Sequence, residues 1–248
     1  MDFRSFTRGE ALPSLSEWYP WPVGRSWLRC MMLTTLDGAV RGADGESGSL
    51  SCPTDQYVFR QLRRFAQAVL VGAGTLRAEE YAPLVGGDDS RERVARGLTP
   101  APVLVVVTSS MDLRWDDPVF LHSTMTPLVI TTDSAPADAI DRARRHVEVI
   151  TLPGTQVDPY QLVSAIAYRG MTHVLCEGGP TLLAQLSQAG LVDEADITIA
   201  PMQAAGGQIV TGVAMPATPQ LTLKSVIEQD GWLFTRYARP VDLERTPR

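Results

Sequence analysis

The stretch HVLCEGGPTLL, residues 173–183, decides the fold of this chain. An apolar run ends at Glu177, two glycines follow, and Pro180 suits the first position of a helix, where its missing N–H would be unpaired anyway. A strand that becomes a helix through Gly178 and Gly179 leaves bare backbone N–H groups at the positive end of the helix dipole. The stretch therefore predicts a phosphate or diphosphate site. The alternative is a plain tight turn between a strand and a helix.

Outward from this stretch, buried strands alternate with helices. Apolar runs predict strands at residues 27–35, 68–72, 103–107, 128–132, 147–151 and 173–176. Apolar residues at helical spacing predict helices at 53–65, 136–145, 159–168 and 180–189. Near the end, residues 221–228 and 232–237 alternate around Asp230-Gly231, which predicts an antiparallel hairpin. We therefore expect an α/β fold, with a mixed, mostly parallel central sheet flanked by helices and a C-terminal antiparallel hairpin.

Several of these predicted strands end in polar or glycine-rich residues. Thr35-Leu36-Asp37-Gly38, Gly72-Ala73-Gly74-Thr75 and Thr108-Ser109 follow three of them. Ligands of open α/β sheets bind beyond the carboxyl ends of the strands, so these residues are expected to meet near Glu177-Gly178-Gly179. Gly72 to Arg77 begins like a dinucleotide fingerprint, but Arg77 stands where the third glycine would be.

Composition limits the class of protein. The chain has 248 residues, 44% hydrophobic and 20% charged, with a net charge of −6. We expect an N-terminal arm over residues 1–26 and one domain over 27–248, with residues 85–101 as a long surface loop. The negative charge does not favour nucleic acid, and no apolar run approaches membrane-spanning length, so we expect a cytoplasmic protein without nucleic-acid or membrane partners. Three scattered cysteines and three histidines without ligand spacing predict no metal site.

The ordered motifs resemble those of a known family. Thr34-Thr35-Leu36-Asp37-Gly38, Gly45-Glu46-Ser47, Leu62-Arg63, residues 68–75, Glu177 to Thr181 and residues 190–194 are similar, in order and spacing, to the reductase domain of riboflavin biosynthesis. In many bacteria that domain follows a zinc deaminase domain and has a dihydrofolate-reductase-like fold. The deaminase signature, an H-x-E together with a P-C-x-x-C, does not occur here, so we expect a stand-alone reductase.

The resemblance implies an NADPH-dependent reduction of 5-amino-6-(5-phosphoribosylamino)uracil to its ribitylamino counterpart, by a homodimer. It implies substrate contacts at Ser47, Arg63, Leu84 and Glu177, with Arg63 suited to the 5′-phosphate. The implied cofactor contacts are Leu33, Ser49, Thr75, Glu79, Ser109, Gly178, Gly179, Pro180, Thr181, Leu182 and Leu183. Hydride transfer still needs a proton source, and Asp37 and Glu177 are the candidate catalytic acids. The alternative for Asp37 is a turn-forming Asp-Gly pair.

Two positions depart from the family pattern. Ser49 replaces the usual aromatic residue, and the stretch after Leu84 lacks an arginine that helps to hold the substrate in the family. Two other functions therefore remain open. One is an NADPH-dependent reductase of another heterocycle such as dihydrofolate, for which Asp55 or Asp37 could supply the acid. The other is a nucleotide-binding module without turnover.

Overall fold

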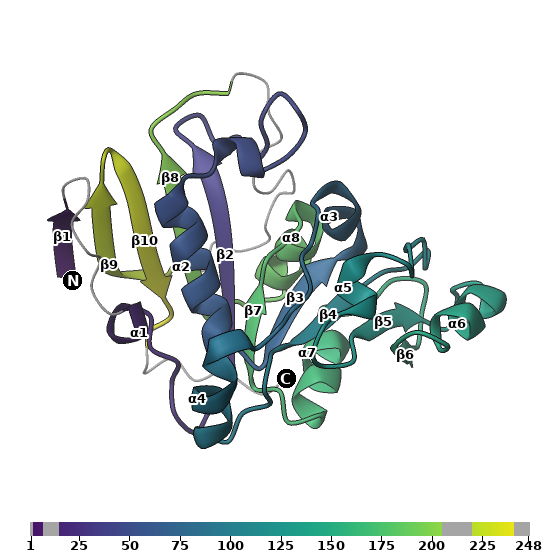
Figure 1. The fold of residues 1–248 in the computed structure, drawn as a ribbon. Helices are drawn as coiled ribbons and strands as arrows, with labels where there is room; N and C mark the ends of the chain where they lie inside the picture. Colours follow the sequence, from purple (N-terminus) through teal and green to yellow (C-terminus); the bar gives the residue numbers. More distant parts are fainter. Residues whose placement is uncertain (1, 7–14, 205–219, 241–248) are drawn as a thin grey trace.

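The computed structural model describes residues 2–6, 15–204 and 220–240. These residues form one ten-stranded sheet with helices on both faces (Figure 1). The strands are β1 Asp2–Phe6, β2 Trp27–Thr35, β3 Ala68–Gly72, β4 Val103–Val107, β5 Leu128–Thr132, β6 Glu148–Leu152, β7 His173–Cys176, β8 Glu194–Ala200, β9 Thr222–Gln229 and β10 Trp232–Ala238. The helices are α1 Leu15–Trp18, α2 Pro53–Arg64, α3 Ala73–Ala78, α4 Ser90–Ala95, α5 Pro118–Leu121, α6 Ala137–Ala143, α7 Pro159–Tyr168 and α8 Pro180–Gln188, with 3₁₀ turns η1 Gly48–Leu50 and η2 Gly87–Asp89.

The strand order is β1-β9-β10-β8-β2-β7-β3-β4-β5-β6. The strands from β8 to β6 in this order are parallel, and β10 pairs antiparallel with β8 and with β9. Asp230 and Gly231 both have positive φ angles, 52° and 83°, so the predicted hairpin turn is confirmed. The mixed, mostly parallel sheet with a C-terminal hairpin is confirmed as well.

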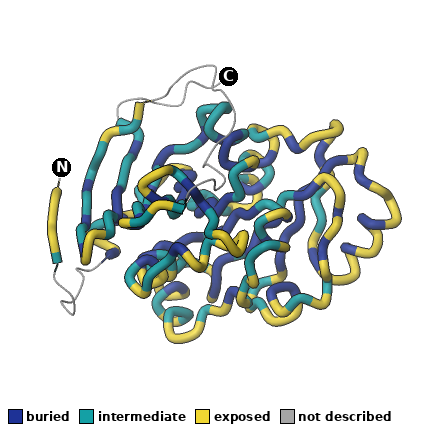
Figure 2. The backbone as a smooth tube through the Cα atoms, turned by 90° about the horizontal axis from the view of Figure 1, so that it is seen from above, coloured by how far each residue is buried: buried dark blue, intermediate teal, exposed yellow. Residues whose placement is uncertain are grey.

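The core lies on both faces of the sheet. Alternate residues of β3 point to opposite sides: Leu70 packs with α7 and α8, whereas Val69 and Val71 pack with α3, α5 and α6. A third cluster places α1 and α2 against Phe234 of the hairpin. Figure 2 shows the buried strands running through the middle of the molecule. Burial on both faces explains why the parallel strands are apolar nearly throughout.

One expectation about the outer parts of the chain was wrong, since residues 85–101 hold η2 and α4 and are not an open loop. Within the expected N-terminal arm, β1 pairs parallel with β9 and forms an edge strand of the sheet. In the described part of the chain, no helix has the length and apolar character needed to cross a bilayer.

Candidate active site

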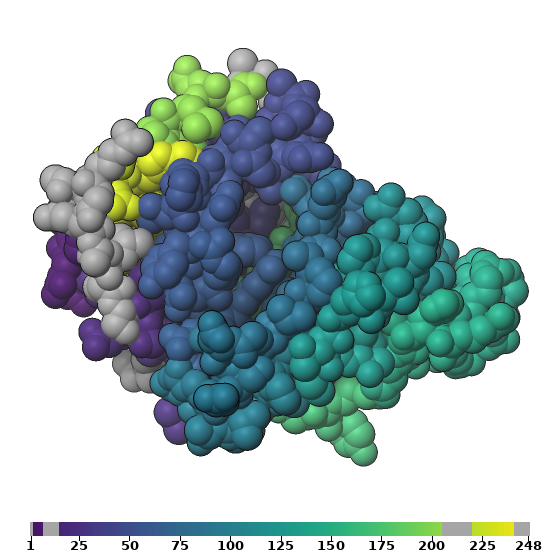
Figure 3. Space-filling view, in the orientation of Figure 1, coloured from purple at the N-terminus to yellow at the C-terminus, as the bar shows by residue number. Residues whose placement is uncertain are grey.

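A pocket of about 350 Å³ opens beside the carboxyl ends of β2 and β7. It lies between α2 on one side and α3 with the segment after it on the other, where Figure 3 shows the molecular surface hollowed. Its walls come from segments that are far apart in the sequence. They are Met31–Leu33, Val40, Arg41, Ser47, Gly48, Ser51, Asp55, Gln56, Phe59, Arg63, Thr75, Glu79–Ala82, Glu177, Gly179 and Pro180.

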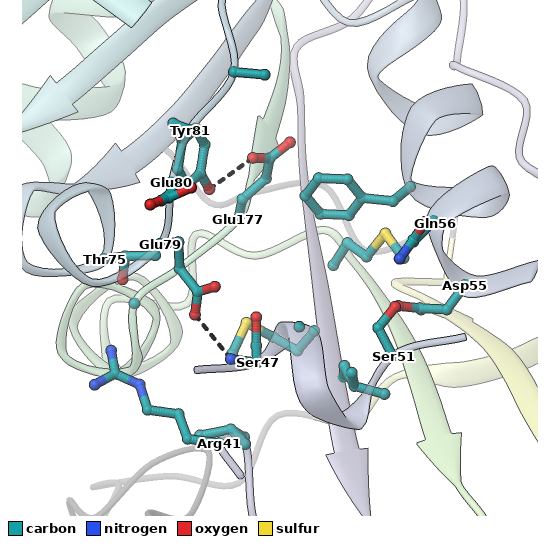
Figure 4. Close-up of a pocket in the computed structure, with 18 of the residues that line it drawn as sticks. Arg41, Ser47, Ser51, Asp55, Gln56, Thr75, Glu79, Glu80, Tyr81 and Glu177 are labelled. Atoms are coloured by element: carbon teal, nitrogen blue, oxygen red, sulfur yellow. Dashed lines mark hydrogen bonds between the residues drawn. The ribbon is translucent and has the colours of Figure 1, made fainter. Parts of the chain in front are cut away.

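Arg63 and Glu177 form a bidentate ion pair in the wall of this pocket. Arg63 donates from Nε and Nη2 to the two Glu177 oxygens at 2.6 and 2.7 Å. The Tyr81 hydroxyl donates to the same carboxylate at 2.9 Å (Figure 4). The guanidinium also lies over the rings of Phe59 and Tyr81, 4.3 and 5.4 Å from their centroids. A planar fork against a carboxylate, with aromatic faces beside it, fixes the Glu177 carboxylate in one orientation.

The protonation states of the ion pair and its tyrosine follow from burial and charge. Burial alone lowers the pKa of Arg63, but the charge and hydrogen bonds of Glu177 outweigh it and raise that pKa, so Arg63 stays cationic. Burial, together with the charge of Glu177, raises the pKa of Tyr81 well above its ordinary value. Tyr81 therefore remains a phenol and can donate a hydrogen bond.

Asp55 supplies a buried acceptor at the opposite side of the pocket. The side chain sits in the first turn of α2, and the Ser51 hydroxyl donates to its Oδ2 at 2.6 Å. Oδ1 is buried and has no hydrogen-bond partner among the described residues. Burial raises the pKa of Asp55, against the opposing effect of the Ser51 and Thr198 hydroxyls. Because Asp55 lines the pocket, its carboxyl group is suited to accept an N–H group of a ligand.

The Gly178-Gly179 turn connects β7 to α8. Gly178 has a φ of 93°, which favours glycine, and its carbonyl accepts the N–H of Gly72 at 2.8 Å. A Cβ on Gly179 would overlap the hydroxyl of Thr75. The backbone can therefore lie this close to Thr75 only because residue 179 is a glycine. The N–H groups of Gly179, Thr181 and Leu182 donate to no backbone carbonyl in the described part of the chain.

A second pocket of about 360 Å³ begins where the first ends. Thr181, Leu182 and Gln185 of α8 line it, directly after the Gly179 and Pro180 that line the first pocket. Its remaining walls are Gly72–Gly74, Arg77, Val107–Ser110, Gln156 and Val157. The two pockets therefore lie on either side of the start of α8.

The structure brings together most of the residues predicted from the sequence. Leu33, Ser47, Arg63, Thr75, Glu79, Glu177, Gly179 and Pro180 line the first pocket. Ser109, Thr181 and Leu182 line the second. The backbone N–H of Ser47 donates to Glu79 Oε1 at 3.0 Å and ties the loop before α2 to the end of α3.

Five predicted residues line neither pocket. Asp37 is exposed in the turn after β2, where it accepts the Thr35 hydroxyl at 2.5 Å and the Ala204 N–H at 3.2 Å, as the turn-forming alternative expects. Ser49 is exposed and donates to Asp44 at 3.0 Å. Leu84 and Leu183 are buried in hydrophobic clusters, because each faces a sheet surface that needs an apolar side chain. Gly178 contributes its carbonyl to the bond with Gly72 instead.

Sequence reasoning missed several residues of the first pocket. Tyr81 and Phe59 frame the ion pair, and Arg41 and Gln56 also line the pocket. Phe59 carries a signal, since it lies one helical turn before Arg63 on the same helix. Arg41 and Tyr81 carry none, because the loop before α2 and the segment after α3 meet only in the folded chain.

The arrangement defines an α/β protein with a ligand site at the carboxyl edge of a parallel sheet. The sequence pattern of one protein family, the RibD C-terminal domain, matches residues 26–231 of this chain. The chain therefore belongs to that family. It is 31% identical over 174 residues to the 2,5-diamino-6-ribosylamino-4(3H)-pyrimidinone 5′-phosphate reductase of Methanothermobacter thermautotrophicus, covering 69% of this chain and 76% of that protein. The reductase of the same name from Archaeoglobus fulgidus is 26% identical, over 72% and 81%.

Solved structures agree with this assignment. A pyrimidine reductase-like protein from Corynebacterium diphtheriae superposes with a TM-score of 0.81 at 26% identity, over 93% of this chain and all of that one. The bifunctional deaminase/reductase of Thermotoga maritima shares the fold with a TM-score of 0.68 at 19% identity, and this chain covers 57% of it. The predicted riboflavin-biosynthesis reductase family and its fold class are thus confirmed, and the chain is a reductase of this family.

Proposed function

We propose that this chain reduces a ribosylaminopyrimidine 5′-phosphate in riboflavin biosynthesis, with hydride transfer from NADPH to the ribosyl C1 that yields the ribitylamino product. The observation that carries the proposal is the continuous site at the start of α8. One pocket holds the fixed Glu177 carboxylate and the buried Asp55, and the other extends past Thr181 toward Ser109. A substrate and a dinucleotide fit side by side in such a site.

The residues around α8 fit a dinucleotide phosphate. The N–H groups of Gly179, Thr181 and Leu182 are available to phosphate oxygens, and the helix dipole adds to the attraction. NADPH bound there would supply the hydride. Arg77, with Ser109 and Ser110, offers a cation and two hydroxyls at the far end of the second pocket, a donor set suited to a 2′-phosphate. This donor set supports NADPH over NADH.

Asp55 bears on which pyrimidine is the substrate. The uracil expected from the sequence presents a carbonyl oxygen at C2, whereas the pyrimidinone named for the archaeal relatives presents an amino group there. The Asp55 carboxylate, which lines the pocket, accepts an N–H and is repelled by a carbonyl oxygen. We therefore infer that the 2-amino pyrimidinone is the preferred base, provided that the base faces Asp55.

Glu177 and Tyr81 are the groups that we assign to the ribosylamine. Arg63 holds the Glu177 carboxylate, which can accept an N–H or O–H of the substrate. Tyr81 donates to the same carboxylate and keeps its proton at neutral pH. Because Asp37 lies outside the pocket and Tyr81 keeps its own proton, we assign the proton needed beside the ribosyl carbon to solvent, with the Tyr81–Glu177 pair orienting the ribosylamine.

The test is a set of NADPH oxidation assays with the 2,5-diamino pyrimidinone phosphate, the amino-uracil phosphate and dihydrofolate. We expect turnover of the phosphorylated pyrimidines, with the higher kcat/KM for the 2-amino compound. Turnover of dihydrofolate alone would support the second candidate, which Asp55 also favours because a pterin carries the same amino group. NADPH binding without turnover of any of them would contradict an enzymatic role.

Two further properties are proposals of the same kind. The chain is expected to act as a homodimer in the cytoplasm, as the family resemblance implies. Light scattering of the purified protein tests the dimer directly, and a mass of one chain, 27.0 kDa, would refute it.

A further inference from the structure

Arg41 is a cation of the first pocket that the proposed function has not used. Its side chain is half-buried and lines the pocket. Within the described ranges 2–6, 15–204 and 220–240, its guanidinium has neither an ion pair nor a hydrogen bond. Its nitrogens are not among the buried polar atoms without a partner in the described chain, so its N–H donors remain accessible to a ligand in the pocket. An unpartnered guanidinium at a pocket wall points to an anionic ligand.

The charges of the pocket make this cation necessary. Six charged side chains line it: Arg41, Arg63, Asp55, Glu79, Glu80 and Glu177. Arg63 and Glu177 cancel each other in their bidentate pair, so Arg41 alone remains against three carboxyl groups. A diphosphate that entered this pocket without a cation beside it would be repelled by those carboxyl groups.

The position of Arg41 selects the cofactor side of the pocket. Figure 4 shows Arg41 on the side of Thr75 and Glu79, away from Asp55 and Gln56. Thr75 in turn lies against Gly179, since a Cβ on that glycine would overlap its hydroxyl. Arg41 therefore lies on the wall that carries the free N–H groups at the start of α8, and not on the wall that carries the buried Asp55.

The loop that follows Arg41 is ordered by its own hydrogen bonds. The Gly42 N–H donates to the Glu46 carbonyl at 2.8 Å, and Asp44 accepts the Glu46 N–H and the Ser49 hydroxyl. A Cβ on Gly42 would overlap the Ser49 hydroxyl, so the loop is closely folded at that point. The bond from Ser47 to Glu79 fixes the loop to α3. The backbone of the loop that carries Arg41 is thus ordered before a ligand binds, which limits the backbone entropy lost on binding.

We propose that Arg41, from the same wall of the pocket as the α8 N–H groups, binds the diphosphate of NADPH together with them. This inference rests on the proposed function, because it concerns the cofactor of that reaction. It assigns to Arg41 the cofactor phosphates and not the phosphate of the substrate, even though the arginine expected after Leu84 is absent from this chain.

The experiment compares wild type, Arg41→Ala, Arg41→Lys and Arg60→Ala by fluorescence titration with NADPH in the absence of substrate. Arg60 is an exposed arginine of α2 outside both pockets and serves as the matched control. We expect Arg41→Ala to raise the Kd for NADPH about tenfold and to flatten its salt dependence. Arg41→Lys should recover part of the affinity, because it keeps the charge but loses the bidentate fork. Arg60→Ala should match wild type.

Two fragments and one kinetic measurement locate the contact. 2′-Phospho-ADP-ribose, which keeps the diphosphate, should lose affinity in Arg41→Ala as NADPH does, whereas adenosine 2′,5′-bisphosphate should lose much less. An unchanged Kd for NADPH combined with a raised KM for the pyrimidine phosphate would overturn the proposal and place Arg41 at the substrate phosphate. Failure of wild type itself to bind NADPH would refute the proposed function, a result distinct from a variant that matches a functional wild type.

Discussion

The buried carboxyl group of Asp55 costs stability and lines the pocket proposed for the substrate base. Because burial raises the pKa of this carboxyl, the folded chain favours its neutral form. The penalty is therefore absent below the unfolded pKa of about 3.9, grows as the pH rises from there toward the raised folded pKa, and is complete above it. We expect Asp55→Asn to stabilise the protein at pH 7 by about 1 kcal/mol, a rise in Tm of roughly 2–4 °C, and this gain should vanish near pH 4.

The same substitution should impair catalysis. An amide at position 55 can present its N–H₂ to the 2-amino group of the base, so we expect KM for the diamino pyrimidinone to rise about tenfold. Thermal melts at several pH values test the predicted change in stability, and steady-state kinetics test the predicted change in KM. Asp138→Asn, on the exposed face of α6, is the control and should affect neither KM nor the pH dependence in this direction. A lower Tm of Asp55→Asn at pH 7 would contradict the burial argument.

Arg77 carries the expected preference for NADPH over NADH. Its Nη1 donates to the Asp112 carbonyl at 2.7 Å, which holds the guanidinium beside Ser109 and Ser110 at the second pocket. We expect Arg77→Ala to lower kcat/KM for NADPH about tenfold and to leave the value for NADH unchanged, because only NADPH carries a 2′-phosphate. Because both cofactors are measured with the same variant, the kcat/KM for NADH serves as the control for the kcat/KM for NADPH. An equal loss with both would show that Arg77 supports the fold of the pocket instead.

At the scale of elements, the turn between β7 and α8 depends on the space between Gly179 and Thr75. We expect Gly179→Ala to force the Thr75 hydroxyl aside and to raise the Kd for NADPH about tenfold, by filling the space above the α8 N–H groups. The double variant Thr75→Ala/Gly179→Ala removes the overlap, so its Tm should return toward that of Thr75→Ala while its affinity for NADPH stays low. Recovery of both properties would mean that the glycine serves packing alone.

The sequence predicts those elements whose stability is local or whose burial is complete. The strands β2, β3, β4, β5 and β7 begin and end where their apolar runs predict. α4 is different: its six residues, SRERVA, have little apolar character, and it is anchored by Arg93, which donates to the carbonyls of Thr99 and Arg64. β1 has an exposed sequence, DFRSF, that becomes a strand only because the edge of β9 is available. The residues that stabilise α4 and β1 lie outside these two segments, so the local sequence pattern predicts neither element.

The residues of the candidate site also fall into two groups, those that the sequence predicts and those that only the folded chain reveals. Glu177, Gly179 and Thr75 lie at the ends of predicted strands, so the sequence alone places them at one edge of the sheet. Tyr81 and Arg41 come from segments without a repeating pattern, and only their contacts across the pocket reveal them. Leu84 and Leu183 show the reverse error, since they match family positions in sequence while the folded chain buries both in its core.

At the scale of the whole molecule, the parallel half of the sheet places the ends of β2, β3, β4 and β7 along one edge. The two pockets follow that edge and share the start of α8. A ligand that occupies both contacts residues of the loop before α2, of α3, of the segment after β4 and of α8 at once. Its binding free energy is therefore linked to the unfolding of the whole domain and not to one loop.

This linkage gives a prediction that does not require the substrate. At a free NADPH concentration of 100 times its Kd, the folded state should gain about 2.7 kcal/mol, which corresponds to a rise in Tm of roughly 5–10 °C for a domain of this size. NADH at the same concentration should give a smaller rise, because it does not reach Arg77 with a phosphate. Adenosine 2′,5′-bisphosphate, which fills only the second pocket, should lie below NADPH as well. Differential scanning calorimetry measures all three. Equal shifts for NADPH and the bisphosphate would mean that the first pocket contributes nothing to cofactor binding, and the continuous site would then have to be abandoned.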